Sequence, residues 1–345
     1  MLSKKYCVRK LILFCLSFLL ISLFSCSKNT ATGGGTTNPT TPTPVTTLIT
    51  LPQGWKYAAS YTSGLPNGMQ VFTYDSVYAG KTTKVFCLAY DSKLDRFEFK
   101  PVVATAAKKP GDFFSQETGV VYACINGGYF GGNQSYSLVK YNNVVASPNI
   151  KAVNRMYNGG TTAYYPTRAA FGVSSTGVPS TSWIYHVGTG NDNIYSYPLP
   201  SPNIEGNLPQ AIPTETFPAG GAVWAPVSAI GGSPMLLKSG SITISDAEEL
   251  ININNTTARP RSAIGYTANG IVLIVAVEGD NPSAGYTGLN LVELATMLKD
   301  LSCTNAINLD GGGSTSMIIA NRQTVRPGDN GVERPVVSAL MIKQK

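Results

Sequence analysis

Residues 271–278 read Ile-Val-Leu-Ile-Val-Ala-Val-Glu, an unbroken apolar run that ends in a carboxylate. Such a run predicts a strand buried on both faces, because a strand at the surface would alternate with polar residues. Runs rich in β-branched and aromatic residues predict further strands at 70–78, 84–90, 96–103, 120–125, 306–309, 316–320 and 336–342. The sequence therefore predicts a fold organised around a β-sheet, with 271–278 as a central strand.

Three short segments predict helices. Asn290 is followed three residues later by Glu293, which is capping-box spacing, and apolar residues then recur at helical intervals. Residues 245–248, Ser-Asp-Ala-Glu, carry the same capping pattern, and Asp112 is placed to cap a helix that runs to Gln116. The predicted fold class is α+β: a largely mixed β-sheet with two or three packed helices and glycine-rich site loops at strand ends.

Residues 1–25 predict a lipoprotein signal peptide. Basic residues between Lys4 and Lys10 precede the apolar run Leu11–Phe24, which has signal-peptide length and is short for a membrane span. Ser25-Cys26 at its end resembles a bacterial lipobox, which implies that Cys26 becomes the lipidated first residue of the mature protein. An ordinary signal peptide with a stray cysteine is the alternative. On the first interpretation we expect an extracytoplasmic protein held at the bacterial outer membrane by its lipid alone.

Composition divides the rest of the chain into three regions. Residues 26–50 are rich in Thr, Pro and Gly and predict a flexible tether. Residues 51–111 predict an N-terminal strand-rich subregion, and residues 112–343 predict the domain that carries the candidate site. Within that domain, 191–221 is rich in proline and predicts a surface excursion without long regular elements.

Charge and composition exclude several classes of partner. Part of the net charge of +7 comes from the predicted signal peptide, and no stripe of Lys or Arg follows it, so nucleic acid is not expected as a partner. His186 is the single histidine and no paired-cysteine spacing occurs, so neither a metal nor another cofactor is expected. Cys87, Cys124 and Cys303 are expected to be buried thiols, with a Cys124–Cys303 disulfide left open.

Three polar motifs at the ends of apolar runs mark candidate site loops. Asn126-Gly127-Gly128 directly follows 120–125, and Glu278 ends the central run. Arg261-Ser262 precedes a small apolar stretch, where an arginine is expected to hold an anion. Each motif also has a plainer interpretation, as a tight turn, a strand exit and a structural salt bridge respectively.

The most specific motif is Asp310-Gly311-Gly312-Gly313-Ser314, which lies between two predicted strands. Three consecutive glycines leave backbone N–H groups free to form an anion-binding nest, and Asp310 places a carboxylate at its edge. No Gly-Lys-Ser/Thr sequence follows, which excludes a Walker A loop. The motif predicts a site for an anionic ligand beside an acid.

Taken in order, these motifs resemble the phosphodiester glycosidase family. The resemblance runs from about residue 112 to 343. Ser262 stands where the family more often has Thr, and Glu278-Gly279 stands where Asp-Gly is common. The matching stretches are Asn126–Phe130, Gly231–Pro234, Arg261–Gly265, Glu278-Gly279, Gly288–Asn290 with Glu293–Ala295, and Leu309–Ser314.

The resemblance implies a hydrolase that cleaves a sugar 1-phosphodiester at the anomeric carbon, so the expected partner is a sugar-phosphate or glycan substrate. Arg261 and the amides of 311–313 would hold the phosphate. Asp310 and Glu278 are the candidates to activate water or to attack the anomeric carbon, with their division of roles left open. A non-catalytic glycan-binding lipoprotein is the alternative function. The substrate-binding candidates are Asn126, Gly127, Gly128, Ser262, Gly311, Gly312, Gly313 and Ser314.

Overall fold

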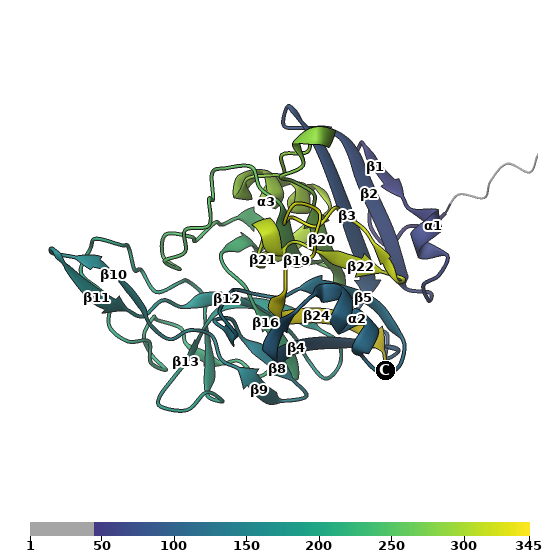
Figure 1. The fold of residues 1–345 in the computed structure, drawn as a ribbon. Helices are drawn as coiled ribbons and strands as arrows, with labels where there is room; N and C mark the ends of the chain where they lie inside the picture. Colours follow the sequence, from purple (N-terminus) through teal and green to yellow (C-terminus); the bar gives the residue numbers. More distant parts are fainter. Residues whose placement is uncertain (1–44) are drawn as a thin grey trace, which may run out of the picture. The chain divides into compact units, whose positions relative to one another are not determined.

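The computed structural model describes residues 45–345, of which Thr46–Lys345 form one compact unit (Figure 1). The predicted signal peptide, Cys26 and most of the predicted tether lie outside the described residues. The described part is mostly β-sheet, and no helix in it is long and apolar enough to cross a membrane. Its three α-helices are α1 (Ala59–Thr62), α2 (Pro110–Gln116) and α3 (Leu291–Asp300).

The predicted central strand is β20 of an eight-stranded sheet. It lies between β3 and β19, and its side chains alternate between two hydrophobic clusters, so it is buried on both faces as expected. The strands of this sheet, in order, are β1 (Trp55–Tyr57), β2 (Met69–Tyr78), β3 (Lys81–Asp91), β20 (Ile271–Val277), β19 (Arg261–Thr267), β21 (Cys303–Asn308), β17 (Met235–Lys238) and β18 (Ser241–Ile242).

Two smaller sheets pack with it around one of these clusters. The five-stranded sheet is β23 (Arg322–Gln323), β22 (Met317–Ile319), β5 (Val121–Asn126), β24 (Val336–Gln344) and β4 (Phe97–Lys108). The seven-stranded sheet is β15 (Ala222–Val223), β14 (Ile194–Tyr197), β13 (Pro179–His186), β12 (Arg168–Val173), β16 (Ser228–Gly231), β8 (Val139–Tyr141) and β9 (Val144–Ser147). Two hairpins each form a separate two-stranded sheet: β6 (Phe130–Gly131) with β7 (Gln134–Ser135), and β10 (Val153–Tyr157) with β11 (Gly160–Tyr164).

Strand pairing in the described residues is antiparallel throughout, whereas the sequence favoured a largely mixed sheet. The crossover that contains helix α3 shows the reason. Helix α3 connects β20 to β21, but β19 lies between these two strands and is antiparallel to both. The helix therefore crosses over a strand instead of joining parallel neighbours.

Helix α3 confirms the predicted capping box. The side chain of Asn290 accepts from the backbone N–H of Glu293, and the Glu293 carboxylate accepts from the backbone N–H of Asn290. The apolar face of the helix packs on the same cluster as one face of β20. Its buried residues are Leu291, Leu294, Ala295, Met297 and Leu298.

The other two helix predictions need correction. Residues 246–250 form turns rather than a helix, because the Ser245 hydroxyl donates to the Glu249 carboxylate instead of capping a backbone N–H. Helix α2 begins at Pro110, two residues before the predicted cap, and Asp112 lies in its first turn. Proline is well suited to this first position because its missing N–H would have no partner there.

Residues 51–111 share sheets with the rest of the chain: β3 pairs with β20 and β4 pairs with β24. The proline-rich stretch 191–221 contains one short strand, β14, in agreement with the predicted excursion.

The three cysteines of the described part, Cys87, Cys124 and Cys303, are free and buried. Burial raises the pKa of each thiol. The structure therefore favours buried thiols over the Cys124–Cys303 disulfide.

Candidate active site

A polar cavity of about 520 Å³ opens where β19 begins and where β20 and β21 end. We call it the arginine–glycine cavity. These three strands are neighbours in the sheet, so Arg261 stands opposite Val277 and Ala263 opposite Asn308. Their antiparallel register brings segments far apart in sequence to one edge. The lining residues are Tyr129, Ile253, Asn254, Arg259, Arg261, Asp280, Asp310, Gly311, Gly312, Gly313, Gly328, Asp329, Asn330 and Arg334.

Asp310 is the most perturbed acid of the cavity. Burial raises the pKa of its carboxyl to about 6, against the opposing effects of hydrogen bonds from Ser314 and from the Gly311 N–H and of the charge on Arg334. The Gly311 N–H lies 2.9 Å from Oδ1. A carboxyl with this pKa is mostly ionised at neutral pH yet holds a proton more readily than a solvated aspartate, which suits proton transfer or nucleophilic attack.

The glycine loop only partly forms the predicted anion nest. The Gly311 N–H is directed at the Asp310 carboxylate, and the Gly312 N–H donates to the carbonyl of Pro260 at 2.8 Å. Two of the three amides are therefore already engaged. The glycines also have a steric role, because a β-carbon on Gly311 would stand 2.9 Å from the Pro260 carbonyl oxygen.

Arg261 lines the cavity, but its guanidinium is held by main-chain carbonyls rather than by an acidic side chain. It is 2% exposed. Its Nε donates to Leu289 at 3.0 Å, its Nη1 to Ile253 at 3.3 Å, and its Nη2 to Asn254 at 2.8 Å and Thr257 at 3.0 Å. Four of its five N–H donors are thus used to fix the loop 253–257 and the segment before α3.

Two arginines that the sequence analysis did not single out, Arg259 and Arg334, also line the cavity. Arg259 pairs with Asp280 at 3.6 Å, and its Nε is buried without a hydrogen-bond partner among the described residues. Arg334 pairs with Asp329 at 3.2 Å and is 44% exposed. Their positions in the sequence were the signal that could have identified them. Arg259 lies two residues before Arg261, and Arg334 lies just before the apolar strand β24.

Glu278 lies outside the cavity lining and is 1% exposed. Its Oε1 accepts from Asn281 at 2.8 Å, and its Oε2 accepts from the backbone N–H of Arg326 at 3.0 Å and pairs with Lys84 at 3.2 Å. The carboxylate therefore holds the segment around 326, which leads into the wall formed by residues 328–330. The structure does not bring Glu278 and Asp310 together as lining groups.

Asn126 and Ser262 lie behind the cavity and support the Asp310 loop. Asn126 is fully buried, and its Nδ2 donates to the backbone carbonyl of Asp310 at 2.6 Å. The Ser262 hydroxyl donates to Asn126 Oδ1 at 2.7 Å. Ser314 is also buried and is not among the lining residues. Of the four sequence motifs, two therefore place their polar side chains, Arg261 and Asp310, in the cavity lining, whereas Asn126 and Glu278 lie outside it.

Gly127 and Gly128 are required by packing. A β-carbon on Gly127 would stand 2.3 Å from Ser338 Oγ, and one on Gly128 would stand 2.4 Å from Ser137. Neither residue lines the arginine–glycine cavity. Tyr129, the next residue, does line it, and its hydroxyl donates to the Ser233 carbonyl at 2.6 Å.

His186 is a buried structural residue. Its Nε2 accepts from the backbone N–H of Asn149 at 3.0 Å, and its Nδ1 lies 2.5 Å from the carbonyl oxygen of Asn191, to which it donates. Burial lowers its pKa. Within residues 45–345, no group of three or more His, Cys, Asp or Glu side chains is arranged to hold a metal ion.

Sequence comparisons identify related proteins over part of the chain. The N-acetylglucosamine-1-phosphodiester alpha-N-acetylglucosaminidase of Bos taurus is 29% identical over 114 residues, which cover 30% of this chain and 21% of that protein. An SPbeta prophage-derived protein of Bacillus subtilis (strain 168) is 34% identical over 83 residues, covering 24% of this chain and 12% of that protein. The alignment thus spans about a fifth of the length of the bovine relative.

Solved structures show the same fold. The catalytic domain of zebrafish N-acetylglucosamine-1-phosphodiester alpha-N-acetylglucosaminidase, auto-inhibited by its pro-peptide, has a TM-score of 0.55 at 19% identity, covering 84% of this chain and 88% of that one. A hypothetical protein from Synechocystis has a TM-score of 0.54 at 18% identity, covering 81% and 63%. Residues 119–343, more than half of the sequence and including the glycine loop and all three cavity arginines, match the model of one family. The chain belongs to the phosphodiester glycosidase family.

Proposed function

We propose that this chain hydrolyses a sugar 1-phosphodiester at the anomeric carbon, in the arginine–glycine cavity. Membership of the phosphodiester glycosidase family supports the reaction class. The name of the bovine relative supports an N-acetylglucosamine-like sugar joined to a phosphodiester. The observation that carries the proposal is that Asp310, with a pKa of about 6, shares one cavity with Arg259 and Arg334.

Arg259 and Arg334 are the proposed phosphate-binding residues. Each pairs with one aspartate, and a guanidinium has five N–H donors, so each keeps donors for the oxygens of a phosphodiester. Arg261 has four donors engaged by carbonyls and is better suited to shape the cavity than to hold the phosphate. We therefore assign the phosphate contact to Arg259 and Arg334 rather than to Arg261, which the sequence favoured.

Asp310 is the proposed catalytic carboxylate. Hydrolysis breaks the bond between the anomeric carbon and the bridging oxygen and gives a reducing sugar and a phosphate monoester. The leaving phosphate gains negative charge, which the two arginines stabilise. The ionised Asp310 either takes a proton from the attacking water, which inverts the anomeric configuration, or attacks the carbon itself, which retains it after a second step. Glu278 then acts by holding the segment around 326 in place.

The decisive experiment follows the hydrolysis of UDP-N-acetylglucosamine, a sugar 1-phosphodiester, by proton NMR, and locates the label by mass spectrometry of the products formed in water enriched in oxygen-18. We expect free N-acetylglucosamine with the label in the sugar, and the first anomer formed reports inversion or retention. Asp310→Asn is expected to lower the rate by roughly 10²–10⁴-fold. Asp300→Asn, on the exposed end of α3, is the matched control and should leave the rate unchanged. Label in the phosphate, or near-normal turnover in Asp310→Asn, would contradict the proposal.

We also propose that Cys26 carries a lipid that holds the protein at the outer membrane. The support is in the sequence alone: a basic segment, an apolar run of signal-peptide length, and Ser25-Cys26. Wild-type protein is expected in the membrane fraction and Cys26→Ala in the soluble or uncleaved fraction. Cys7→Ala, inside the predicted signal peptide, is the control and should partition like wild type. Unchanged membrane partitioning and processing of Cys26→Ala would refute the anchor.

A further inference from the structure

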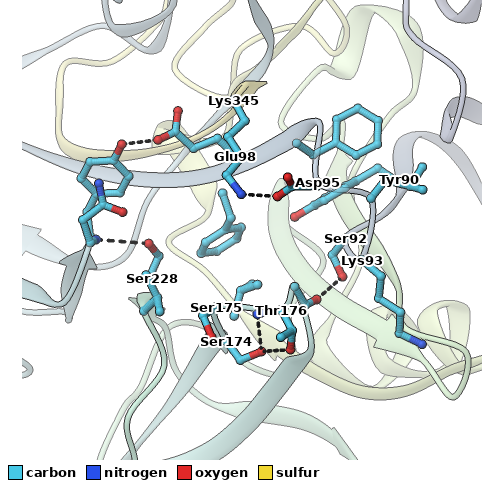
Figure 2. A pocket seen from close by; sticks show the side chains of 18 residues that line it. Tyr90, Ser92, Lys93, Asp95, Glu98, Ser174, Ser175, Thr176, Ser228 and Lys345 are labelled. Atoms are coloured by element: carbon cyan, nitrogen blue, oxygen red, sulfur yellow. Dashed lines mark hydrogen bonds and ion pairs between the residues drawn. The ribbon is translucent and has the colours of Figure 1, made fainter.

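A second cavity, of about 450 Å³, lies where the three sheets meet (Figure 2). We call it the Tyr90 cavity. Its walls come from the end of β3, the start of β4, the end of β8 and the turn after β12. Its volume falls within the range of roughly 300–1,000 Å³ that small-molecule sites occupy.

The Tyr90 cavity is separate from the arginine–glycine cavity. Tyr90 stands opposite Val272, near one end of β20, whereas Arg261 stands opposite Val277 at the other end. Five residue steps along a strand, from Val272 to Val277, span about 17 Å. The two cavities share no lining residue. A ligand in the Tyr90 cavity therefore has no part in the proposed hydrolysis.

Tyr90 provides the most specific feature of this cavity. The residue is 1% exposed, and its hydroxyl has no hydrogen-bond partner among the described residues. Figure 2 shows the side chain directed from β3 towards the cavity. A buried hydroxyl without a partner costs free energy, and a ligand that hydrogen-bonds to it removes that cost.

The charged groups of the cavity balance one another. Lys345 pairs with Asp95, the Tyr141 hydroxyl donates to Glu98, and the Lys93 ammonium donates to the carbonyl of Asn269 at 3.0 Å. No charged side chain in the lining is left without such a partner. A charged ligand such as a phosphodiester is not favoured, because the charged side chains of the lining, Lys93 and Lys345 against Asp95 and Glu98, carry no net charge.

The uncharged lining combines hydroxyls with aromatic rings. Ser174, Ser175 and Thr176 come from one turn, and Phe99 and Tyr141 from facing strands. A purely apolar ligand would leave the buried Tyr90 hydroxyl without a partner, which is costly. A sugar matches both kinds of surface, because its hydroxyls pair with polar groups and its C–H faces pack on rings.

We propose that the Tyr90 cavity is a non-catalytic binding site for a neutral sugar of one or two rings. The juxtaposition of an unpartnered buried hydroxyl, a turn of hydroxyl side chains and aromatic rings carries the inference. It goes beyond the proposed hydrolysis and does not depend on it. A protein with both sites would hold a glycan at one end of β20 while a phosphodiester reacts at the other.

The test uses saturation-transfer NMR and calorimetry with a fixed panel of glucose, galactose, mannose, N-acetylglucosamine, cellobiose and chitobiose. We expect at least one of these to bind the wild-type protein. Tyr90→Phe should weaken its binding about two- to tenfold, the loss of one hydrogen bond. The same variant should keep or raise the thermal midpoint, because the hydroxyl has no partner to lose.

Tyr164→Phe is the matched control for Tyr90→Phe. Its hydroxyl donates to the Asn207 carbonyl at 2.6 Å and lies outside both cavities. This control should lower the thermal midpoint and leave sugar binding unchanged. Ser175→Trp fills the cavity from an exposed turn and should abolish binding, whereas Ser60→Trp on α1 should not.

Two results would overturn the proposal. The first is that no sugar of the panel binds the wild-type protein. The second is that binding survives Ser175→Trp and is displaced by UDP-N-acetylglucosamine, which would place the sugar in the arginine–glycine cavity instead. Hydrolysis should be unchanged in Tyr90→Phe and Ser175→Trp, so failure of this site and failure of the proposed hydrolysis are distinguishable.

Discussion

Arg334 lies directly against Gly313: a β-carbon on Gly313 would stand 2.1 Å from Nη2 of Arg334. The guanidinium can occupy this place only because residue 313 has no side chain. The third glycine of the loop thus sets the position of a cavity arginine, in addition to any contact that its own amide makes.

We therefore expect Gly313→Ala to displace Arg334 without unfolding the protein. The colliding group is the end of a flexible side chain, and the backbone at 313 does not require glycine, so the free energy of unfolding should stay within about 1 kcal/mol of wild type. Loss of a phosphate contact should raise KM for UDP-N-acetylglucosamine about tenfold or more. Gly190→Ala, where nothing lies within 4 Å of the new β-carbon, is the control. Unchanged kinetics in Gly313→Ala would argue against a phosphate role for Arg334.

The proposed reaction should depend on the ionisation of Asp310. Because its pKa is raised to about 6 and the reaction needs the carboxylate, kcat/KM should rise with pH through about 6 and level off above it. The profile is measured with a substrate that does not titrate in this range. A rate that is flat between pH 5 and 8 would mean that another group limits the reaction.

Because its pKa is raised in the folded protein, the ionised Asp310 lowers the free energy of unfolding at neutral pH. The folded protein binds the proton more tightly than the unfolded chain, so the stabilising effect is complete below the unfolded value of 3.8 and is lost as pH rises through about 6. The loss is on the order of 3 kcal/mol. Asp310→Asn should therefore unfold at higher urea concentration than wild type at pH 7.5 and no higher at pH 3.5. A lower midpoint for the variant at pH 7.5 would contradict this.

Arg261→Ala should destabilise the fold more than it changes phosphate binding. The substitution leaves the carbonyls of Ile253, Asn254, Thr257 and Leu289 without their donor, which should cost about 3 kcal/mol or more. Urea unfolding measures the loss, with Arg322→Ala, an exposed arginine over the Tyr61 ring, as control. A stable Arg261→Ala protein with a large rise in KM would instead make Arg261 a phosphate ligand.

Glu278→Gln separates a positioning role from a catalytic one. The amide would turn an N–H group towards the Arg326 N–H or the Asn281 amide, so we expect a loss of about 1–3 kcal/mol in unfolding free energy. The decrease in kcat should remain below the roughly 10²-fold that an essential acid or base produces. Glu205→Gln, at the surface, is the control. A stable variant without turnover would show that Glu278 takes part in the chemistry.

Elements with a strong local signal were predictable from the sequence. The run 271–278 is apolar on both faces because two clusters sandwich β20, and the strand is found where the pattern placed it. Asn290 and Glu293 satisfy each other within one turn, so their helix start could be inferred from spacing alone. In both cases the residues that decide the structure are neighbours in sequence.

The helix predicted after Ser245 is absent for the opposite reason: contacts with distant residues decide the structure there. Glu249 is fully buried, and its carboxylate accepts from Ser233, Ser245 and the indole of Trp183. Trp183 and Ser233 come from other parts of the chain, and they draw the acid inward so that the local helix pattern is overridden. The sequence of residues 245–249 alone does not predict these hydrogen bonds.

The choice among the arginines also depends on contacts between distant residues. Sequence reasoning held that a buried Arg261 needs an anion, but the carbonyls of a folded loop provide the negative partners instead. Whether an arginine faces a cavity or a loop depends on the path of that loop, which local pattern does not encode. That Arg259 and Arg334 line one cavity is seen only in the folded chain.

The three free cysteines of the described residues can report how often different parts of the fold open. Cys87 and Cys303 belong to the cluster beneath α3, and Cys124 to the one beside α2. Because only an exposed thiolate reacts with an aromatic disulfide reagent, each cysteine is labelled at a rate set by how often its own region opens. Exchange at Cys124 and at the Cys87–Cys303 pair would therefore time the opening of two parts of the domain separately. Within residues 45–345, no disulfide has to be reduced first.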